Sequence, residues 1–243
     1  MNPGENSVLA VLKGGLIVSC QASKGEPLCK PEIIGALCQS ALSGGARALR
    51  LEGLENISYV KKLTKYSNAP ANVPIIGITK TEDLTKDQML DQVYITSTLV
   101  EAISVARAGA DIVALDATAR PRPDNLSLAQ TIEKIHKETS ALVWADTATI
   151  EEARQAQEAG CDIVSTTLYG YTRQTQLPSD AEPSFEFLEQ CIKELKVPVI
   201  LEGRVWHPAE VERAIKLGAH AVVVGSAITR PHLITERFVN ATK

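Results

Sequence analysis

Two glycine-containing segments in the last third of the sequence have the composition of phosphate-binding loops. Gly203 and Arg204 follow the apolar run "PVILE", and Gly225 and Ser226 follow the run "AVVV". Glycine lets the backbone approach phosphate oxygens closely, and the free N–H groups at the start of a helix attract anions. We therefore predict a phosphate site made by these residues together with Arg230, whose guanidinium can add a charge-assisted hydrogen bond. Two tight turns without a ligand are the alternative.

A second set of polar residues ends other apolar runs along the chain. Its members are Gln21, Arg50, Glu52, Lys80, Asp116, Asp146, Thr166, Thr167 and Glu202. Each of these residues could instead have a purely structural role. The aspartates could cap turns, and Gln21 and Arg50 could be hydrogen-bonded residues of a rim. Lys80 could be solvated, and Glu202 could form a salt bridge with Arg50 or Lys80.

The apolar runs themselves are short, rich in β-branched residues and separated by stretches with helical spacing. We predict strands at residues 16–21, 48–53, 74–79, 112–117, 142–147, 163–168, 198–203 and 221–226. Strands that alternate with helices in this way require a parallel sheet with both faces covered.

A near-repeat indicates how this sheet closes. Residues 106–118, 156–168 and 214–226 each contain a helix end, a glycine, a small residue and a strand. Repetition of one βα unit favours a closed (β/α)8 TIM barrel of the α/β class, in a single domain over residues 1–243. An open doubly wound sheet is the alternative, but the first strand lacks the GxGxxG turn. In a barrel the carboxyl ends of all strands meet at one mouth, so the polar residues should converge there.

The segments outside these strands have predicted places in the barrel. The first residues should form a short helix that plugs the bottom of the barrel, and the tail from Arg230 onward should form the last barrel helix. The longest irregular stretches, 80–97 and 169–183, follow strands and should therefore cover the mouth.

The composition argues against several classes of function. The net charge is −4 and no dense block of Lys and Arg occurs, so we expect no nucleic-acid partner. No stretch approaches the roughly 20 apolar residues of a membrane span, and the start of the chain does not resemble a signal peptide. The five cysteines are odd in number and lack a CxxC pair, which predicts reduced thiols in the cytoplasm and no zinc site.

A series of motifs in barrel order runs through essentially the whole chain. They are "GGLIVSCQ", "ALRLEG", "PIIGITK", "IVALDAT" with "RPRP", "WADTATIEEA", "TTLYGYT", "ILEGRVWHPAEV" and "VVVGSAITRP". Together they resemble the N-acetylmannosamine-6-phosphate 2-epimerase family. The resemblance implies a barrel that interconverts N-acetylmannosamine 6-phosphate and N-acetylglucosamine 6-phosphate in sialic-acid breakdown, without metal, nicotinamide or other cofactor. It also implies a homodimer.

The implied reaction removes the proton at C2 of the opened sugar, passes through an enolate and returns a proton to the opposite face. The resemblance implies catalytic roles for Lys80 and Glu202, and substrate contacts for Gln21, Arg50 and Asp146. A lysine that acts as a base must be neutral, which burial and a neighbouring cation such as Arg50 favour. A glutamate that acts as an acid must hold a proton, which burial favours.

Other residues near the mouth are expected to play supporting parts. Asp116 is a candidate for orienting the catalytic lysine, and Tyr94 and Tyr171 are candidates for lining lids over the sugar. Arg120 and Arg122 of the "ARPRP" segment are expected on a solvated loop.

Two other functions remain open at this point. Another cofactor-free phosphosugar isomerase would share the phosphate loops, but its catalytic pair would be two Asp, or an Asp and a Cys, on strands one and five, whereas strand one ends here in Gln21. A barrel that only binds a phosphosugar would need no acid and base, and substitution of Lys80 or Glu202 would then change affinity alone.

Overall fold

A closed barrel of parallel strands forms the centre of the protein, seen in a computed structural model that describes residues 7–66, 73–178 and 181–242. The strands follow sequence order: β1 (Gly15–Cys20), β2 (Ala48–Glu52), β3 (Ile75–Ile78), β4 (Ile112–Asp116), β5 (Leu142–Asp146), β6 (Ile163–Ser165), β7 (Val199–Glu202) and β8 (Ala221–Val224). β1 pairs with β8 from Gly15↔Ala221 to Val18↔Val224, which closes the ring. The predicted (β/α)8 barrel is confirmed, and every strand overlaps its predicted range.

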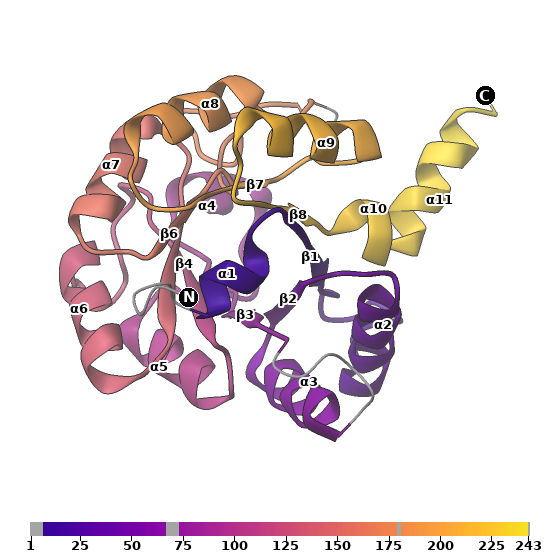
Figure 1. The fold of residues 1–243 in the computed structure, drawn as a ribbon, viewed down its shortest axis with the longest axis horizontal. Coiled ribbons are helices and arrows are strands. Elements are labelled where there is room, and N and C mark those ends of the chain that lie inside the picture. The colour runs from indigo at the N-terminus through magenta and orange to yellow at the C-terminus, as the bar shows by residue number, and fades with distance from the viewer. Residues whose placement is uncertain (1–6, 67–72, 179–180, 243) are drawn as a thin grey trace.

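Helices lie around the barrel and at its two ends (Figure 1). They are α1 (Ser7–Leu12), α2 (Pro31–Ser43), α3 (Leu54–Tyr66), α4 (Lys86–Asp91), α5 (Leu99–Arg107), α6 (Leu128–Glu138), α7 (Ile150–Glu158), α8 (Phe185–Glu194), α9 (Pro208–Leu217), α10 (Ser226–Thr229) and α11 (Pro231–Asn240). Thr98, Ser127 and Thr149 start three consecutive barrel helices with capping boxes, in which the side chain accepts from the third helical N–H group.

The alternation of side chains along each strand builds two hydrophobic layers. On β5, Trp144 points into the barrel, whereas Val143 and Ala145 pack against the helices, and all three are fully buried. Trp144 is among the largest of the fully buried side chains, and its indole N–H donates to Ser165 Oγ at 2.8 Å. The interior is therefore a packed core below the mouth.

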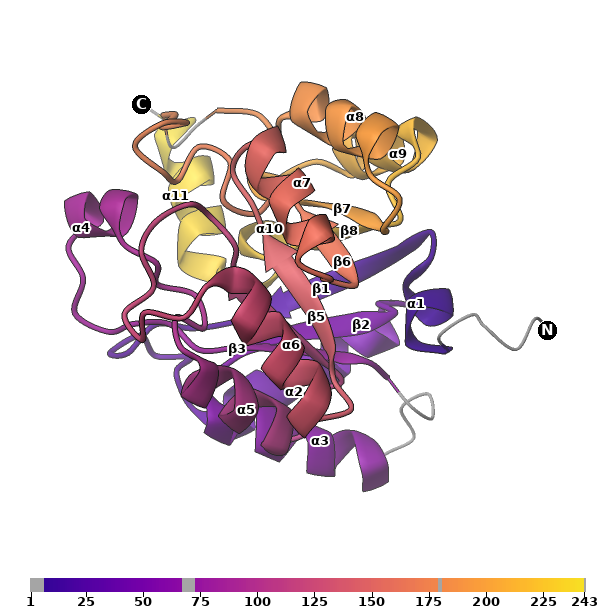
Figure 2. The same cartoon turned by 90° about the vertical axis from the view of Figure 1, so that its left-hand side faces the viewer.

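Helix α1 closes the end of the barrel opposite the strand carboxyl ends. Leu12 is fully buried among the inward-facing residues, and His220 Nε2 lies 2.9 Å from the carbonyl oxygen of Leu9. Figure 2 shows α1 at one end of the barrel and α4 and α11 at the other. The predicted plug is confirmed.

Two segments differ from the prediction. Residues 80–97 are not wholly irregular, because they contain α4 and an antiparallel bridge between Lys80 and Ile95. Helix α11 forms, but none of its residues is buried and it extends away from the ring of helices (Figure 1), so it is not a barrel helix. The four-residue α10 and Pro231, which has no N–H group, start this helix in a new direction.

Within the described residues, no helix is both long enough and apolar enough to cross a membrane.

Gly77 of β3 provides a test of packing between this strand and its helices. A Cβ atom at this position would lie 2.5 Å from Val105 Cγ1 and 2.7 Å from Ala110 Cβ. We expect Gly77→Ala to lower the free energy of unfolding, measured with urea, by about 1–3 kcal/mol because the core is overpacked. The matched control is Gly44→Ala, whose nearest atom would be 3.3 Å away. Equal effects of the two substitutions would contradict this account of packing.

Candidate active site at the barrel mouth

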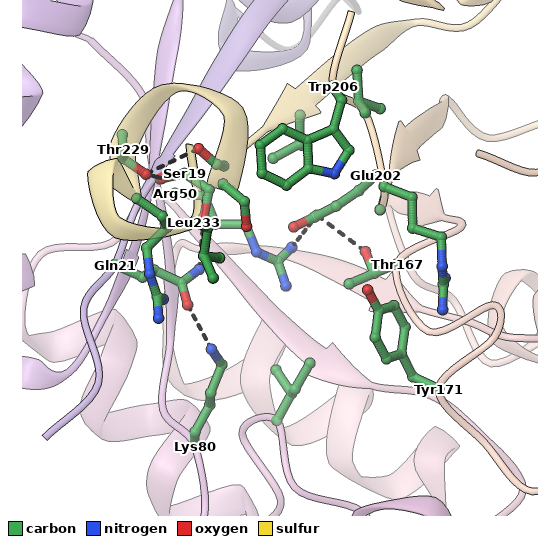
Figure 3. A pocket seen from close by; sticks show the side chains of 18 of the residues that line it. Ser19, Gln21, Arg50, Lys80, Thr167, Tyr171, Glu202, Trp206, Thr229 and Leu233 are labelled. Carbon is green, nitrogen blue, oxygen red and sulfur yellow. Dashed lines mark hydrogen bonds and ion pairs between the residues drawn. The ribbon is translucent and has the colours of Figure 1, made fainter. Parts of the chain in front are cut away.

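A cavity of about 660 Å³ opens at the carboxyl ends of the strands. Figure 3 shows side chains from several strands pointing into this space. The predicted site residues that line the cavity are Gln21, Arg50, Lys80, Glu202, Gly203, Arg204, Gly225, Ser226 and Arg230. The convergence expected from a barrel is therefore present for most of the predicted polar residues. Asp146, Glu52, Asp116 and Thr166 belong to the predicted set but do not line the cavity.

Arg50 lies at the floor of the cavity with only 1% of its side chain exposed. Its Nη2 and Nη1 atoms donate to the two carboxylate oxygens of Asp146, at 2.6 and 3.2 Å, and Nη1 lies 3.0 Å from Glu202 Oε2. Burial alone would lower the pKa of Arg50, but the charges of Asp146 and Glu202 outweigh this effect and raise it. The buried guanidinium is therefore a permanent cation shared by two carboxylates.

Asp146 lies beneath the cavity wall, with no exposed surface. Besides the two bonds from Arg50, its Oδ1 accepts hydrogen bonds from Ser165 Oγ at 2.9 Å and Thr167 Oγ1 at 2.8 Å. Ser165 is in turn held by the indole of Trp144. The geometry thus places Asp146 where it positions Arg50 and Thr167, instead of where a sugar hydroxyl could reach it.

Glu202 ends β7 and points into the cavity beside Arg50 (Figure 3). Its backbone is fixed by Thr166, whose hydroxyl accepts from the Glu202 N–H at 3.1 Å, and its Oε2 lies 3.0 Å from Thr167 Oγ1. Burial raises the pKa of Glu202 to about 7, although Arg50 opposes the shift. The carboxyl group can therefore gain or lose a proton near neutral pH.

Lys80 enters the same cavity directly after β3. Its Nζ donates to Gln21 Oε1 at 2.7 Å and lies 3.1 Å from Glu52 Oε2. Gln21 is oriented by Ser19, whose Oγ accepts from Gln21 Nε2 at 2.8 Å. Arg50, which was expected to act on Lys80, is engaged by Asp146 and Glu202, so the nearest charge to Lys80 is the Glu52 carboxylate. Glu52 belonged to the predicted polar set, but its pairing with Lys80 was not predicted.

The two glycine segments lie together at one side of the cavity, at the ends of β7 and β8. Gly203 and Arg204 have positive φ angles of 111° and 59°, which turns the backbone sharply after Glu202. The Arg204 guanidinium donates to the carbonyl oxygens of Tyr169 and Gly170, at 2.7 and 3.2 Å. Its side chain therefore fastens the start of the segment after β6, at Tyr169 and Gly170, to the mouth.

Arg230 has a partner of its own, because its Nη2 donates to Glu26. Gly225 and Ser226 line the cavity beside it at the start of α10. A phosphate contact from any of these residues stays a prediction.

Arg120 and Arg122 correct one expectation, since neither lies on a solvated loop. The Arg120 side chain is 10% exposed, and its guanidinium donates to Asp116 Oδ2 and to the Met89 carbonyl oxygen, at 2.7 and 2.6 Å. Arg122 donates to the carbonyl oxygens of Asp116 and Thr96, at 2.6 and 3.0 Å. The two arginines bind the 80–97 segment to the end of β4.

Asp116 is fully buried and does not orient Lys80. Its carboxylate accepts hydrogen bonds from Arg120, from the Thr118 hydroxyl and from the Tyr94 N–H. Burial raises the pKa of Asp116, and Arg120 opposes the shift. The sequence did not predict this ion pair. The turn that joins Asp116 to Arg120 has the composition of an exposed loop, but both side chains are buried.

Within the described ranges, no group of three or more His, Cys, Asp and Glu side chains is arranged to hold a metal ion.

Comparison with known proteins identifies close relatives. Residues 34–243 match the family described as "Putative N-acetylmannosamine-6-phosphate epimerase". Proteins described as "Putative N-acetylmannosamine-6-phosphate 2-epimerase" from Cutibacterium acnes and Clostridioides difficile are each 44% identical, over 97% and 96% of this chain and 97% and 98% of their own.

Solved structures agree with this similarity. The N-acetylmannosamine-6-phosphate 2-epimerase from Clostridium perfringens superimposes with a TM-score of 0.87 at 39% identity, over 99% of both chains. A thiamine phosphate pyrophosphorylase from Pyrococcus furiosus, at 19% identity, has a TM-score of 0.59 over 91% of this chain and 89% of its own, and shows the fold alone. The extent of the family match and the identity to these relatives show that the chain belongs to the N-acetylmannosamine-6-phosphate epimerase family.

Proposed function

We propose that this protein interconverts N-acetylmannosamine 6-phosphate and N-acetylglucosamine 6-phosphate by proton transfer at C2, in amino-sugar catabolism. The observation that carries the proposal is the placement of Lys80 and Glu202 in one cavity, after β3 and at the end of β7. In a ring of eight strands, β3 and β7 lie opposite each other. An epimerase needs proton-transfer groups on the two faces of one carbon, and this pair of residues provides them.

The substrate phosphate is assigned to the β7 and β8 side of the cavity, where Gly203, Gly225 and Ser226 present backbone groups. With the phosphate there, C2 of the opened sugar lies between the two catalytic side chains. In one direction neutral Lys80 removes the C2 proton while protonated Glu202 supplies a proton to the other face. The C–H electrons form the enolate, and they return to C2 when the new C–H bond forms.

The reverse direction starts from the Lys80 ammonium and the Glu202 carboxylate. These two starting states hold the same number of protons, because one turnover carries one proton across the substrate. The Glu52 carboxylate lies 3.1 Å from Lys80 Nζ and helps to hold this side chain in the cavity. Thr167 lies between the carboxylates of Asp146 and Glu202 and can donate to either, so its hydroxyl accommodates both protonation states of Glu202.

We assign to Arg50 the role of stabilising the negative charge that develops on O1 of the enolate. It lines the cavity, it is a permanent cation, and Asp146 and Glu202 hold its guanidinium in place. A preorganised donor of this kind stabilises a transition state without having to move during the reaction. Gln21 and Lys80 in its ammonium form are the neighbouring donors.

We also propose a homodimer in which a second copy covers α11. Phe238 and Val239 of this helix are 74% and 48% exposed, and no residue of α11 is buried. A helix of ten residues is marginal in water without packing against an apolar partner. A cytoplasmic location is proposed from the phosphorylated substrate and from the five free cysteines.

The function is tested by incubating the protein with N-acetylmannosamine 6-phosphate in deuterated water, without metal or nucleotide, and following C2 by NMR. We expect N-acetylglucosamine 6-phosphate with deuterium at C2. Lys80→Met and Glu202→Gln should each lower kcat about 10²- to 10⁴-fold, because each removes one proton-transfer group.

The matched control is Lys62→Met, which removes an exposed lysine of α3 and should leave turnover unchanged. A folded wild-type protein that gives neither deuterium exchange nor product would contradict the epimerase assignment. A wild type that binds the substrate without converting it, and that loses only affinity in the two variants, would favour the binding barrel.

The pKa of Glu202, about 7, gives a prediction for the pH dependence. The active pair shares one proton, so below this pKa both groups are protonated and kcat/KM should fall as the pH falls, in both directions. The Thr167 hydroxyl favours the Glu202 carboxylate, so Thr167→Val should raise the pKa of Glu202 and move this limb to higher pH.

Thr167→Ser keeps the hydroxyl and should restore the wild-type profile. If Thr167→Val keeps its fold by circular dichroism and its kcat/KM still falls at the same pH as in the wild type, a group other than Glu202 causes that fall.

A further inference from the structure

A chain of side-chain hydrogen bonds connects the centre of the barrel with Glu202. Its other members are Trp144 and Asp146 of β5, Ser165 at the end of β6, and Thr167 beyond it. Asp146 and Ser165 are partners in the pairing of β5 with β6, so the ring of strands holds them side by side. Trp144 and Ser165 are fully buried and do not line the cavity. Ser165 can therefore influence the reaction only through its neighbours.

The donors and acceptors around Ser165 fix the direction of its hydroxyl group. The indole N–H of Trp144 can only donate, and it lies 2.8 Å from Ser165 Oγ. It occupies one lone pair of this oxygen, so the hydroxyl proton points to another acceptor. Asp146 Oδ1, at 2.9 Å, is charged and is therefore a stronger acceptor than the Thr167 hydroxyl. Ser165 is thus a donor to Asp146 with a fixed orientation.

This donation determines what the Thr167 hydroxyl can do. Thr167 Oγ1 has one proton and two carboxylates within reach, Asp146 Oδ1 at 2.8 Å and Glu202 Oε2 at 3.0 Å. The Oδ1 atom has two lone pairs, and Arg50 Nη1 and Ser165 Oγ each supply a donor to it. The proton of Thr167 is therefore available for Glu202, beside which Figure 3 shows it.

The same arrangement serves both protonation states of Glu202. When Glu202 is ionised, the Thr167 hydroxyl donates to it. When Glu202 holds a proton, it donates to Thr167 Oγ1, and the Thr167 proton turns toward Ser165 Oγ or Asp146 Oδ1, 2.7 and 2.8 Å away. Rotation of one hydroxyl group thus follows the transfer of the proton, and no heavy atom has to move, as a preorganised site requires.

We infer that Ser165 is a positioning residue of the active site, which supplies Asp146 with a donor and thereby leaves the Thr167 hydroxyl free to follow the proton of Glu202. The importance of this role for catalysis rests on the proposed function. Without the Ser165 hydroxyl, Thr167 is drawn to Asp146, the nearer of its two carboxylates, and the ionised form of Glu202 loses a hydrogen bond.

The charged groups that act on Glu202 stay in place when this hydroxyl is removed. Burial raises the pKa of Glu202, and of the charged groups Arg50 on β2 lowers it, Asp146 on β5 raises it and Lys80 after β3 lowers it. The Thr167 hydroxyl also lowers this pKa by donating to the carboxylate. A rise in the pKa of Glu202 without a change of charge nearby therefore reports the loss of that donor.

The test is a carbon NMR titration of the Glu202 carboxyl group without substrate, with the signal assigned from Glu202→Gln. Ser165→Ala should raise the pKa of Glu202 by about half a unit to one unit, as expected for the loss of one hydrogen bond to the ionised form. In the Thr167→Val background, Ser165→Ala should cause no further rise, because Ser165 acts through Thr167. The pH below which kcat/KM falls should move upward by the same amounts.

The matched control is Ser97→Ala, which removes another buried hydroxyl group, a donor to Glu101 Oε2 at 2.8 Å, and should leave the pKa of Glu202 unchanged. Ser165→Ala also leaves the Trp144 N–H without its acceptor. If this variant does not fold, Ser165→Cys fills the same space with a weak donor and should raise the pKa in the same direction.

An unchanged pKa of Glu202 in the folded Ser165 variant would overturn the positioning role. So would a rise of equal size with and without the Thr167 hydroxyl, because Ser165 would then act by another route. A folded wild type without turnover would overturn the proposed function itself, whereas the titration needs no turnover and tests the role of Ser165 separately.

Discussion

The chemistry of the mouth depends on one buried cation between two carboxylates. Arg50 is joined through two hydrogen bonds to Asp146 and lies 3.0 Å from Glu202. One guanidinium can balance the charge of one carboxylate, and Asp146 has the closer contact with it, through two hydrogen bonds from Arg50, and also accepts from Ser165 Oγ. Glu202 therefore bears the cost of burial, and its pKa of about 7 is the result. The proton that the reaction needs is held there because the cation is already engaged.

The barrel topology places the other site residues around this buried cation. β7 and β8 carry the glycine segments, β3 brings Lys80 from the opposite side, and β4 anchors the wall that contains Tyr94. These groups are thus attached to several strands, with Glu202 and the first glycine segment sharing β7, and the closed ring of hydrogen bonds fixes the distances among the strands. Few adjustments are left for substrate binding, which is the condition for electrostatic preorganisation.

Local sequence predicted the barrel because each strand is a β-branched run between helices with start signals and glycine ends. It also predicted which polar residues meet at the mouth, since a barrel brings all strand ends together. The sequence did not predict which charged residues form ion pairs. Whether Lys80 pairs with Glu52 or with Glu202 depends on how far along the barrel axis each side chain lies. Arg120 looked solvated because the segment that buries it precedes it by some thirty residues. Helix α11 has a helical pattern, but no local pattern tells that this helix leaves the ring around the barrel.

The plug formed by α1 has a practical consequence for work with this protein. Leu12 seals the barrel at the end remote from the cavity, and the Leu9 carbonyl oxygen is held there by His220. Helix α1 lies on the side away from the mouth. Immobilisation through α1 therefore orients the barrel with its catalytic opening toward the solution, whereas attachment through α11 would place the support beside the substrate entrance.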